Sequence, residues 1–192
     1  MARPREFDER IAREQALQVF WDKGYEAASL QDLLSAMGLS KSTFYETFSS
    51  KRDLYLDSMD HYSKTEMGFV ALLESDAPAR DAIERVFHAV IDAAFSEGGR
   101  CSCFLVNCVN EVKADDKQVS DRVTEATLRF ESAFETAIRR GMKARDIETA
   151  HDPHALAHFL VSSLNGLRVM LKSSHDRTST ESVVQIVMAA LG

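Results

Sequence analysis

A cluster of polar residues between positions 41 and 46 is the part of the sequence best suited to hydrogen-bond a ligand. It holds an amine, three hydroxyls and a carboxyl, on Lys41, Ser42, Thr43, Tyr45 and Glu46. Phe44 and Phe48 are four positions apart, so a helix turns both rings to one side and leaves the polar groups outside. Lysine suits O6 and N7 of guanine, and hydroxyls suit phosphate oxygens. Such a face is typical of a helix that contacts double-stranded DNA.

The residues before this cluster predict the elements that hold it in place. An apolar face at spacing i, i+3, i+4 and i+7 indicates a short preceding helix, formed by Leu30, Leu33, Leu34 and Met37. Ser29 can cap its start and form a capping box with Asp32. Gly38 can adopt a left-handed backbone after this helix, and Ser40 can cap the next one. A short helix, a glycine turn and a polar second helix together predict a helix-turn-helix.

Two kinds of DNA contact are expected from this segment. The hydroxyls of Ser40, Thr43 and Tyr45 suit phosphate oxygens. Lys41 and Ser42, at the helix start, can reach base edges. Two short amphipathic helices joined by glycine also occur in helical proteins that bind nothing, so the spacing alone leaves DNA binding open.

Three further residues near this segment are candidates for the same interface. Lys51 and Ser29 each stand at the amino end of a predicted helix, where free backbone N–H groups favour a phosphate. Glu46 is less usual, because its carboxylate repels phosphates. It can accept a hydrogen bond from cytosine N4 or pair with Lys41 or Arg52, and we favour the pairing.

The string GLSKSTFYETFSSKRDLY, from Gly38 to Tyr55, resembles the recognition segment of the TetR/AcrR family of transcriptional regulators. That family carries the signature G-(V/L)-S-x-x-(S/T)-(F/L)-Y-x-x-F-x-(S/N)-K. The resemblance covers residues 5–58 and extends more weakly over the whole chain. It implies a homodimeric repressor on a palindromic operator, with half-sites about 34–36 Å apart. It also implies that DNA is contacted by residues of the motif, above all Ser42, Thr43, Tyr45 and Lys51.

Composition and charge favour an all-α cytoplasmic protein. The chain has 192 residues, 45% of them hydrophobic, with only three prolines and eight glycines. No apolar run is long enough to span a membrane, and the first ten residues are too charged for a secretory signal. The net charge of −7 lies outside residues 1–52, which carry eight basic and eight acidic side chains. Arg3 and Arg5 form a short basic arm suited to the minor groove, although a solvated terminus is the simpler interpretation.

Hydrophobic periodicity and capping signals predict nine helices in the TetR-like arrangement. Residues 1–50 are the expected DNA-binding domain and residues 51–192 the expected ligand-binding and dimerisation domain. A first helix is predicted over residues 5–23, ended by Gly24, and a long fourth helix over residues 50–75. Later helices are predicted from Pro78 to Ser96, over residues 101–112, along an apolar stripe from 119 to 138, from Asp152-Pro153, and from Thr178 with Glu181 as a capping box. In the family, the tilt of the fourth helix carries the signal to the head.

The last two predicted helices have wide apolar surfaces that one domain of this size cannot easily bury. The residues concerned are Leu156, Phe159, Leu160, Leu164, Leu167, Met170 and Leu171, and then Val183, Val184, Ile186, Val187, Met188 and Leu191. They can pack as ordinary core, or they can form a dimer interface. We favour the interface, because the family pairs its last two helices with those of a second subunit.

Three cysteines lie close together in the sequence at Cys101, Cys103 and Cys108. A thiol at a helix amino end near Arg100 is activated as a thiolate. The string GRCSCFLVN resembles the corresponding helix start of a TetR-like subgroup, G-x-C-F-L-V-N, some of whose members sense electrophiles or oxidants there, and Cys103 takes the matching place. The simpler interpretation, which we favour, is that Cys103 and Cys108 are small buried apolar residues.

An effector pocket is expected within the predicted body, although the same residues can equally be plain core. The candidates are Met59, Tyr62, Phe69, Phe87, Phe104, Asn107, Phe130 and Phe134. No cofactor and no metal are expected, since the cysteine spacing lacks a paired C-x2-C and His154 with His158 is a weak metal signal. An enzyme is not expected, because the sequence holds no G-x-S-x-G, no H-E-x-x-H and no phosphate-binding glycine loop. A helical adaptor without DNA binding is the other alternative.

Overall fold

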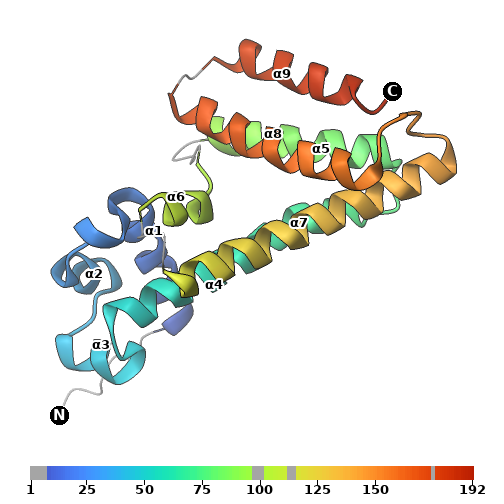
Figure 1. Cartoon of the computed structure of the whole chain (residues 1–192). Helices are drawn as coiled ribbons and strands as arrows, with labels where there is room; N and C mark the ends of the chain where they lie inside the picture. The colour runs from blue at the N-terminus through green and yellow to red at the C-terminus, as the bar shows by residue number, and fades with distance from the viewer. Residues whose placement is uncertain (1–7, 97–101, 112–115, 174–175) are drawn as a thin grey trace. The chain divides into compact units, whose positions relative to one another are not determined.

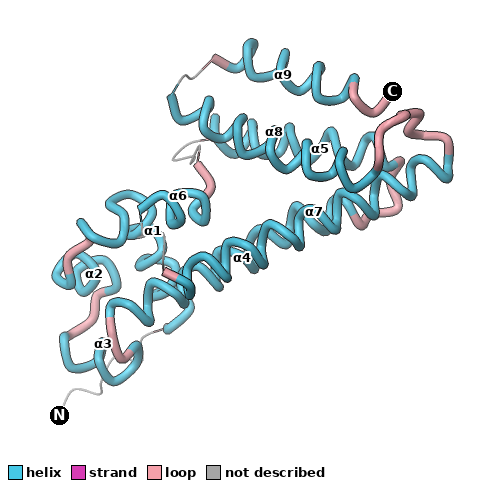
Figure 2. The backbone as a smooth tube through the Cα atoms, in the orientation of Figure 1, coloured by secondary structure: helices cyan, strands magenta, loops and turns pink. Residues whose placement is uncertain are grey.

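The structure is a computed structural model that describes residues 8–96, 102–111, 116–173 and 176–192. All regular secondary structure in these ranges is helical (Figure 2). The helices are α1 (Glu9–Ala27), α2 (Leu30–Met37), α3 (Lys41–Phe48), α4 (Lys51–Leu73), α5 (Ala79–Phe95), α6 (Phe104–Glu111), α7 (Lys117–Ala144), α8 (Pro153–Ser173) and α9 (Arg177–Ala189). The all-α prediction and its nine helices are confirmed over the described residues. None of these helices has the length and apolar character needed to cross a membrane.

The chain divides into two compact units that are not continuous in sequence. The first contains the chain up to Thr65 together with Phe104–Val123, and the second contains Glu66–Cys103 and Thr124–Gly192. Helices α4 and α7 therefore contribute residues to both units. The helical segment after residue 103 packs with the head, although it lies in the predicted body. The predicted division into a DNA-binding domain up to residue 50 and a ligand-binding and dimerisation domain after it is functional, and it stays a prediction.

In the first unit, α1 packs against α2 and α6 (Figure 1). The core of this unit is aromatic. Phe20, Phe44 and Tyr55 are almost fully buried. The rings of Phe20 and Tyr55 pack edge to face with their centroids 5.1 Å apart. Tyr62 packs on Phe104 of α6 at 5.8 Å. These contacts join α6 to α4 and α4 to α1.

In the second unit, α5, α8 and α9 pack against one another (Figure 1). Buried aliphatic and aromatic side chains from these helices, α4 and α7 form one cluster that includes Phe87, Ile91, Phe134, Leu160 and Leu167. A largely buried ion pair lies within this unit, where the Arg168 guanidinium donates to the Glu66 carboxylate at 2.8 Å. Arg168 is only 8% exposed and also lies 5.7 Å from the centre of the Phe69 ring.

Several helix ends agree with the sequence signals. Ser29 and Asp32 form a reciprocal capping box, and Gly38 ends α2 with a left-handed backbone at φ +65°. The backbone N–H of Asp53 donates to the Ser50 hydroxyl at 3.0 Å, as the repeated capping pattern predicts. The Asp152 carboxylate accepts a hydrogen bond from the Ala155 N–H, with Pro153 as the first residue of α8.

The start of α9 differs from the prediction, and the structure adds detail on the exposed side of α6 and the end of α1. Helix α9 begins two residues earlier than predicted, because Asp176 caps it in place of Thr178, and Glu181 pairs with Arg177 instead of forming a capping box with Thr178. Helix α6 is buried on one face only, since Val109 is 42% exposed. Helix α1 extends to Ala27, but the non-helical backbone of Gly24, at φ +77° and ψ 171°, ends its regular part as predicted, and a short helical turn follows. Arg3 and Arg5 lie outside the described residues.

Candidate nucleic-acid interface

Helix α3 is held to the head by its two phenylalanines. Phe44 is fully buried and Phe48 is 3% exposed, and their ring centroids lie 5.8 Å apart. The opposite side of the helix is open to solvent, where Lys41, Ser42, Tyr45 and Glu46 are exposed. Tyr45 is 47% exposed, with its ring edge-on to Phe44 at 5.2 Å. The arrangement of α3 predicted from residue spacing is therefore confirmed.

The hydroxyls at the start of α3 form a local hydrogen-bond network. The Ser40 hydroxyl accepts from the Thr43 backbone N–H at 3.2 Å, which caps the helix. The same oxygen lies 2.9 Å from the hydroxyl oxygens of both Ser42 and Thr43. A hydroxyl can donate once and accept twice, so this network fixes the side chains and leaves lone pairs and protons for a further partner.

The start of α2 is engaged in a tighter network than the sequence indicates. The Ser29 hydroxyl donates to the Asp32 carboxylate at 2.7 Å, and Lys23 donates to the other oxygen of that carboxylate at 2.6 Å. The ammonium of Lys23, with the Ser29 hydrogen bonds, lowers the pKa of Asp32 from 3.8 to about 2. Capping α2 therefore occupies the side chain of Ser29, which leaves less of it for a phosphate.

The amino end of α4 presents two basic side chains over one tyrosine. The Lys51 ammonium lies 4.5 Å from the centre of the Tyr25 ring, and the Arg52 guanidinium lies 5.7 Å from it. Arg52 also donates to Asp116 at 2.5 Å, and this pairing lowers the pKa of the Asp116 carboxyl. Lys51 is thus positioned by a cation–π contact at the helix start where the motif places a phosphate contact.

Glu46 does not form the ion pairs favoured from the sequence. Arg52 is bound to Asp116, and neither it nor Lys41 forms a salt bridge with Glu46 in the described part of the chain. Helix geometry explains the difference, because Arg52 belongs to α4 and turns toward the start of α7. Glu46 therefore remains an exposed carboxylate on the outer face of α3.

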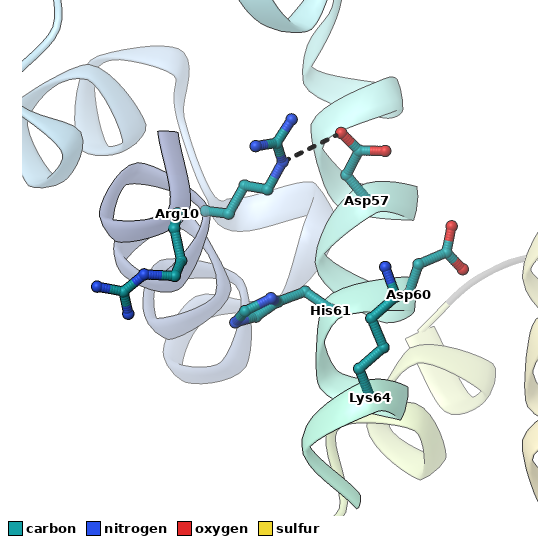
Figure 3. A pocket seen from close by; sticks show the side chains of 6 residues that line it. Arg10, Asp57, Asp60, His61 and Lys64 are labelled. Atoms are coloured by element: carbon teal, nitrogen blue, oxygen red, sulfur yellow. Dashed lines mark ion pairs between the residues drawn. The ribbon is translucent and has the colours of Figure 1, made fainter. Parts of the chain in front are cut away.

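A charged cleft of about 380 Å³ lies between α1 and α4 within the same unit (Figure 3). Asp57, Asp60, His61 and Lys64 project from α4, and Arg10 from α1. Arg13 completes the lining and pairs with both Glu9 and Asp57, at 2.9 and 3.7 Å. Because acidic groups neutralise most of the basic ones, the cleft lacks the single-sign charge of a nucleic-acid surface.

The candidate sensor cysteines are buried where the structure describes them. Cys103 is 8% exposed and Cys108 is 1% exposed, and neither forms a disulfide within the described ranges. Cys101 and Arg100 lie outside the described residues. The Tyr55 hydroxyl, fully buried, forms no hydrogen bond of ordinary geometry in the described ranges. Its burial and the neighbouring Cys108 thiol raise the pKa of Tyr55 far above its usual range.

The residues proposed for an effector pocket fall in both units. Met59, Tyr62 and Phe104 are buried in the first unit, which also contains Asn107. Phe87 and Phe134 are fully buried in the core of the second unit, and Phe130 packs against that core with Phe69 at 6.5 Å. Their ring contacts fit the alternative of plain core packing for most of them. An effector site among them stays a prediction.

The two histidines of α8 each bind a glutamate of α7. His154 Nδ1 lies 3.0 Å from Glu135, and His158 Nδ1 lies 2.7 Å from Glu131. Hydrogen bonds from the Arg139 side chain, chiefly, and from the His154 ring lower the pKa of the Glu135 carboxyl. Within the described ranges, no group of three or more histidine, cysteine or acidic side chains is arranged to hold a metal ion.

A buried aromatic anchor and an exposed hydrogen-bonding face make α2 and α3 a DNA-reading helix-turn-helix. Comparison with known proteins agrees with this geometry. The profile described as bacterial regulatory proteins of the tetR family matches residues 13–57, and the tetracyclin repressor-like C-terminal domain matches residues 78–187. The chain therefore belongs to the TetR family of DNA-binding transcriptional regulators and is not an enzyme.

Individual relatives match along nearly the whole chain. The uncharacterised HTH-type regulator YezE of Bacillus subtilis (strain 168) is 28% identical over 193 residues, covering 100% of both chains. The HTH-type transcriptional repressor ComR of Escherichia coli (strain K12) is 26% identical, covering 98% of this chain and 90% of ComR. A structure of a cysteine mutant of the TetR regulator CifR, complexed with 26-base-pair double-strand operator DNA, has a TM-score of 0.87. It is 27% identical and covers 99% of this chain and 100% of CifR.

Proposed function

We propose that this protein is a homodimeric repressor that binds a palindromic operator and is released by a small-molecule ligand or by cysteine modification. The observation that carries the proposal is the exposed face of α3, where Lys41, Ser42 and Tyr45 stand free of the core. Repression is supported by relatives such as ComR, and operator binding by the complex of a CifR cysteine mutant with operator DNA.

In this proposal the residues of the head divide into base readers and phosphate contacts. Lys41 and Ser42 read base edges from the start of α3. Tyr45, Thr43 and Lys51 bind phosphate oxygens and fix the helix in the groove. Ser40 and Ser29 cap their helices, and their remaining hydrogen-bonding capacity is directed to the phosphate backbone of the DNA. Glu46, exposed and without an ion pair to any described residue, is assigned to an acceptor role at the cytosine N4 amine.

The homodimer is assigned to α8 and α9. These two helices carry four of the large exposed apolar side chains of the chain, Phe159, Val169, Met170 and Ile186, which are 43–72% exposed. Apolar side chains in this number on neighbouring helices are typical of a surface that a partner covers. A twofold axis there presents two copies of α3, which requires an operator with twofold sequence symmetry.

Two routes of release are consistent with the buried groups of the chain. A thiol route uses Cys103 or Cys108, since both are buried thiols and a bulky or charged adduct does not fit a buried site. A ligand route uses apolar surface near Phe87, Phe130 and Phe134. In either case the effector must favour the released conformation over the DNA-bound one, because equal affinity for both shifts nothing. In the proposed mechanism α4 transmits that preference to the head.

The decisive experiment is fluorescence anisotropy of the purified protein on labelled DNA from upstream of its own gene, with and without diamide. Cys103→Ser and Cys108→Ser variants are measured in parallel. We expect wild type to bind this DNA and to lose affinity with diamide, and one of the two variants to stay bound. If all three proteins stay bound, the thiol route is wrong and apolar ligands become the test. If wild type prefers this DNA no more than a scrambled duplex, the duplex is not its operator, and selection from random DNA then decides whether it binds any.

A further inference from the structure

The corner between α1 and α2 lacks a side chain of its own to cap it. Gly24 interrupts α1 with φ +77° and ψ 171°, and a new helical turn closes after it through a hydrogen bond from the Ala28 N–H to the Gly24 carbonyl at 3.2 Å. The first N–H groups of such a turn have no partner within it. Glycine cannot supply the capping oxygen that serine or aspartate supplies at other helix starts.

The missing cap comes from the last residue of α6. The Tyr25 N–H donates to the Glu111 carboxylate at 3.0 Å, across 86 positions of sequence. The carboxylate lies so close to the backbone of Gly24 that an added Cβ would stand 2.7 Å from Glu111 Cδ. Only glycine therefore permits both the left-handed backbone and the approach of the carboxylate.

The ring of Tyr25 also contacts side chains at the amino end of α4. The ring faces the Lys51 ammonium at 4.5 Å and packs on the Tyr55 ring at 4.7 Å. Tyr55 in turn lies beside Cys108, three residues before Glu111 on the same face of α6. Helix α6 thus holds Tyr25 at two points, through its backbone from Glu111 and through its ring by way of Tyr55.

We propose that Glu111 is the positioning residue through which α6 keeps the α1–α2 corner in its operator-binding conformation. This deepens the proposed function and rests on it, because it requires operator binding and control from α6. Displacement of α6, by an adduct at Cys108 or by a ligand, withdraws the carboxylate. The corner then loses its cap, and Tyr25 no longer holds Lys51 at the start of α4.

The test compares Glu111→Ala, Glu111→Gln and the control Glu125→Ala in the full-length protein. Glu125 is exposed and, among the described residues, pairs with Arg129 on its own helix, so its loss removes the same charge without touching the corner. Operator affinity is measured by anisotropy with and without diamide. We expect Glu111→Ala to bind about five- to tenfold more weakly, at the low end of coupling between sites, and to respond less to diamide. The Gln variant keeps an oxygen acceptor and is expected to bind like wild type.

Charge alone predicts the opposite result, because removing a negative group strengthens DNA binding. If Glu111→Ala binds like Glu125→Ala with a full diamide response, the proposal is wrong. Hydrogen exchange of residues 24–28 tests the anchor without DNA, and equal exchange in wild type and Glu111→Ala would overturn it. If wild type binds the operator but does not respond to diamide, only thiol control is contradicted. The affinity comparison still decides the role of Glu111.

Discussion

Helix α3 and the pair α8–α9 each leave one face uncovered in the single chain, but with opposite chemistry. On α3 the open face carries an amine, hydroxyls and a carboxylate, whereas on α8 and α9 it carries Phe159, Val169, Met170 and Ile186. A polar face forms hydrogen bonds with water in the free protein, so its exposure carries no free-energy penalty before DNA binds. An apolar face cannot, because about 25 cal/mol is gained for each Å² that leaves water. In the proposed homodimer, the α8–α9 face is covered permanently by the second subunit, whereas the α3 face is covered only when DNA binds.

The largest effect is expected on the buried side of α3. Replacing Phe44 with alanine removes a fully buried ring and should destabilise the head by about 3–5 kcal/mol. Thermal unfolding followed by circular dichroism measures the loss. Tyr45→Ala, one residue further on and 47% exposed, is the matched control and should melt close to wild type. Equal melting of both variants would contradict the assignment of the two faces.

A charge on the apolar face should separate the proposed dimer. Ile186→Glu places a carboxylate at a 72% exposed position of α9, and we expect dimerisation to weaken by about 2–4 kcal/mol. Light scattering after size-exclusion chromatography reports the mass. Leu128→Glu makes the same change at a 58% exposed position of α7 and should remain dimeric. If both variants remain dimers, the interface lies elsewhere.

A smaller effect is expected on the open face of α3. Lys41→Ala should lose about 1–3 kcal/mol of operator affinity and much of the preference for operator over scrambled DNA. Lys64→Ala removes a lysine of equal charge from α4, lining the cleft of Figure 3, and should keep that preference. Anisotropy on both duplexes at two salt concentrations separates specific from non-specific loss. Equal behaviour of the two variants would show that Lys41 acts through charge alone.

The smallest effect concerns acid stability at the corner of the head. The folded-state pKa of Asp32 is lowered from 3.8 to about 2, chiefly by Lys23. Its ionised form therefore stabilises the fold above pH 3.8, and this contribution disappears as the pH falls toward 2. Urea unfolding at a series of pH values should show a shallower loss of stability in Asp32→Asn than in wild type. Lys23→Ala should flatten the curve in the same direction, and an unchanged curve would contradict the ion pair.

What the sequence could predict was set by interactions between close neighbours. The capping box of Ser29 with Asp32, the left-handed Gly38 and the start of α8 at Pro153 all depend on residues at most four positions apart. The two-sided arrangement of α3 follows from the spacing of Phe44 and Phe48 in the same way. Family resemblance supplied the DNA-binding role, which spacing alone leaves open.

The contacts that could not be predicted join residues far apart in the chain. Arg52 pairs with Asp116 across 64 positions, and Tyr25 binds Glu111 across 86. Nothing local distinguishes Glu111 from other exposed glutamates, and its role depends on where α6 packs. The pairing assigned to Glu46 failed for the same reason, because the competing partner of Arg52 lies on a distant segment.

The composition of the first unit has a consequence for protein engineering. Joining the head of one regulator to the body of another at a single cut requires the head to be one continuous segment. In this chain the head includes Phe104–Val123 as well as the chain up to Thr65. A graft that ends at Thr65 leaves Tyr55 and Tyr62 without Phe104, and Tyr25 without its cap. A working transplant needs two segments, so this DNA reader can be exchanged only as a discontinuous module.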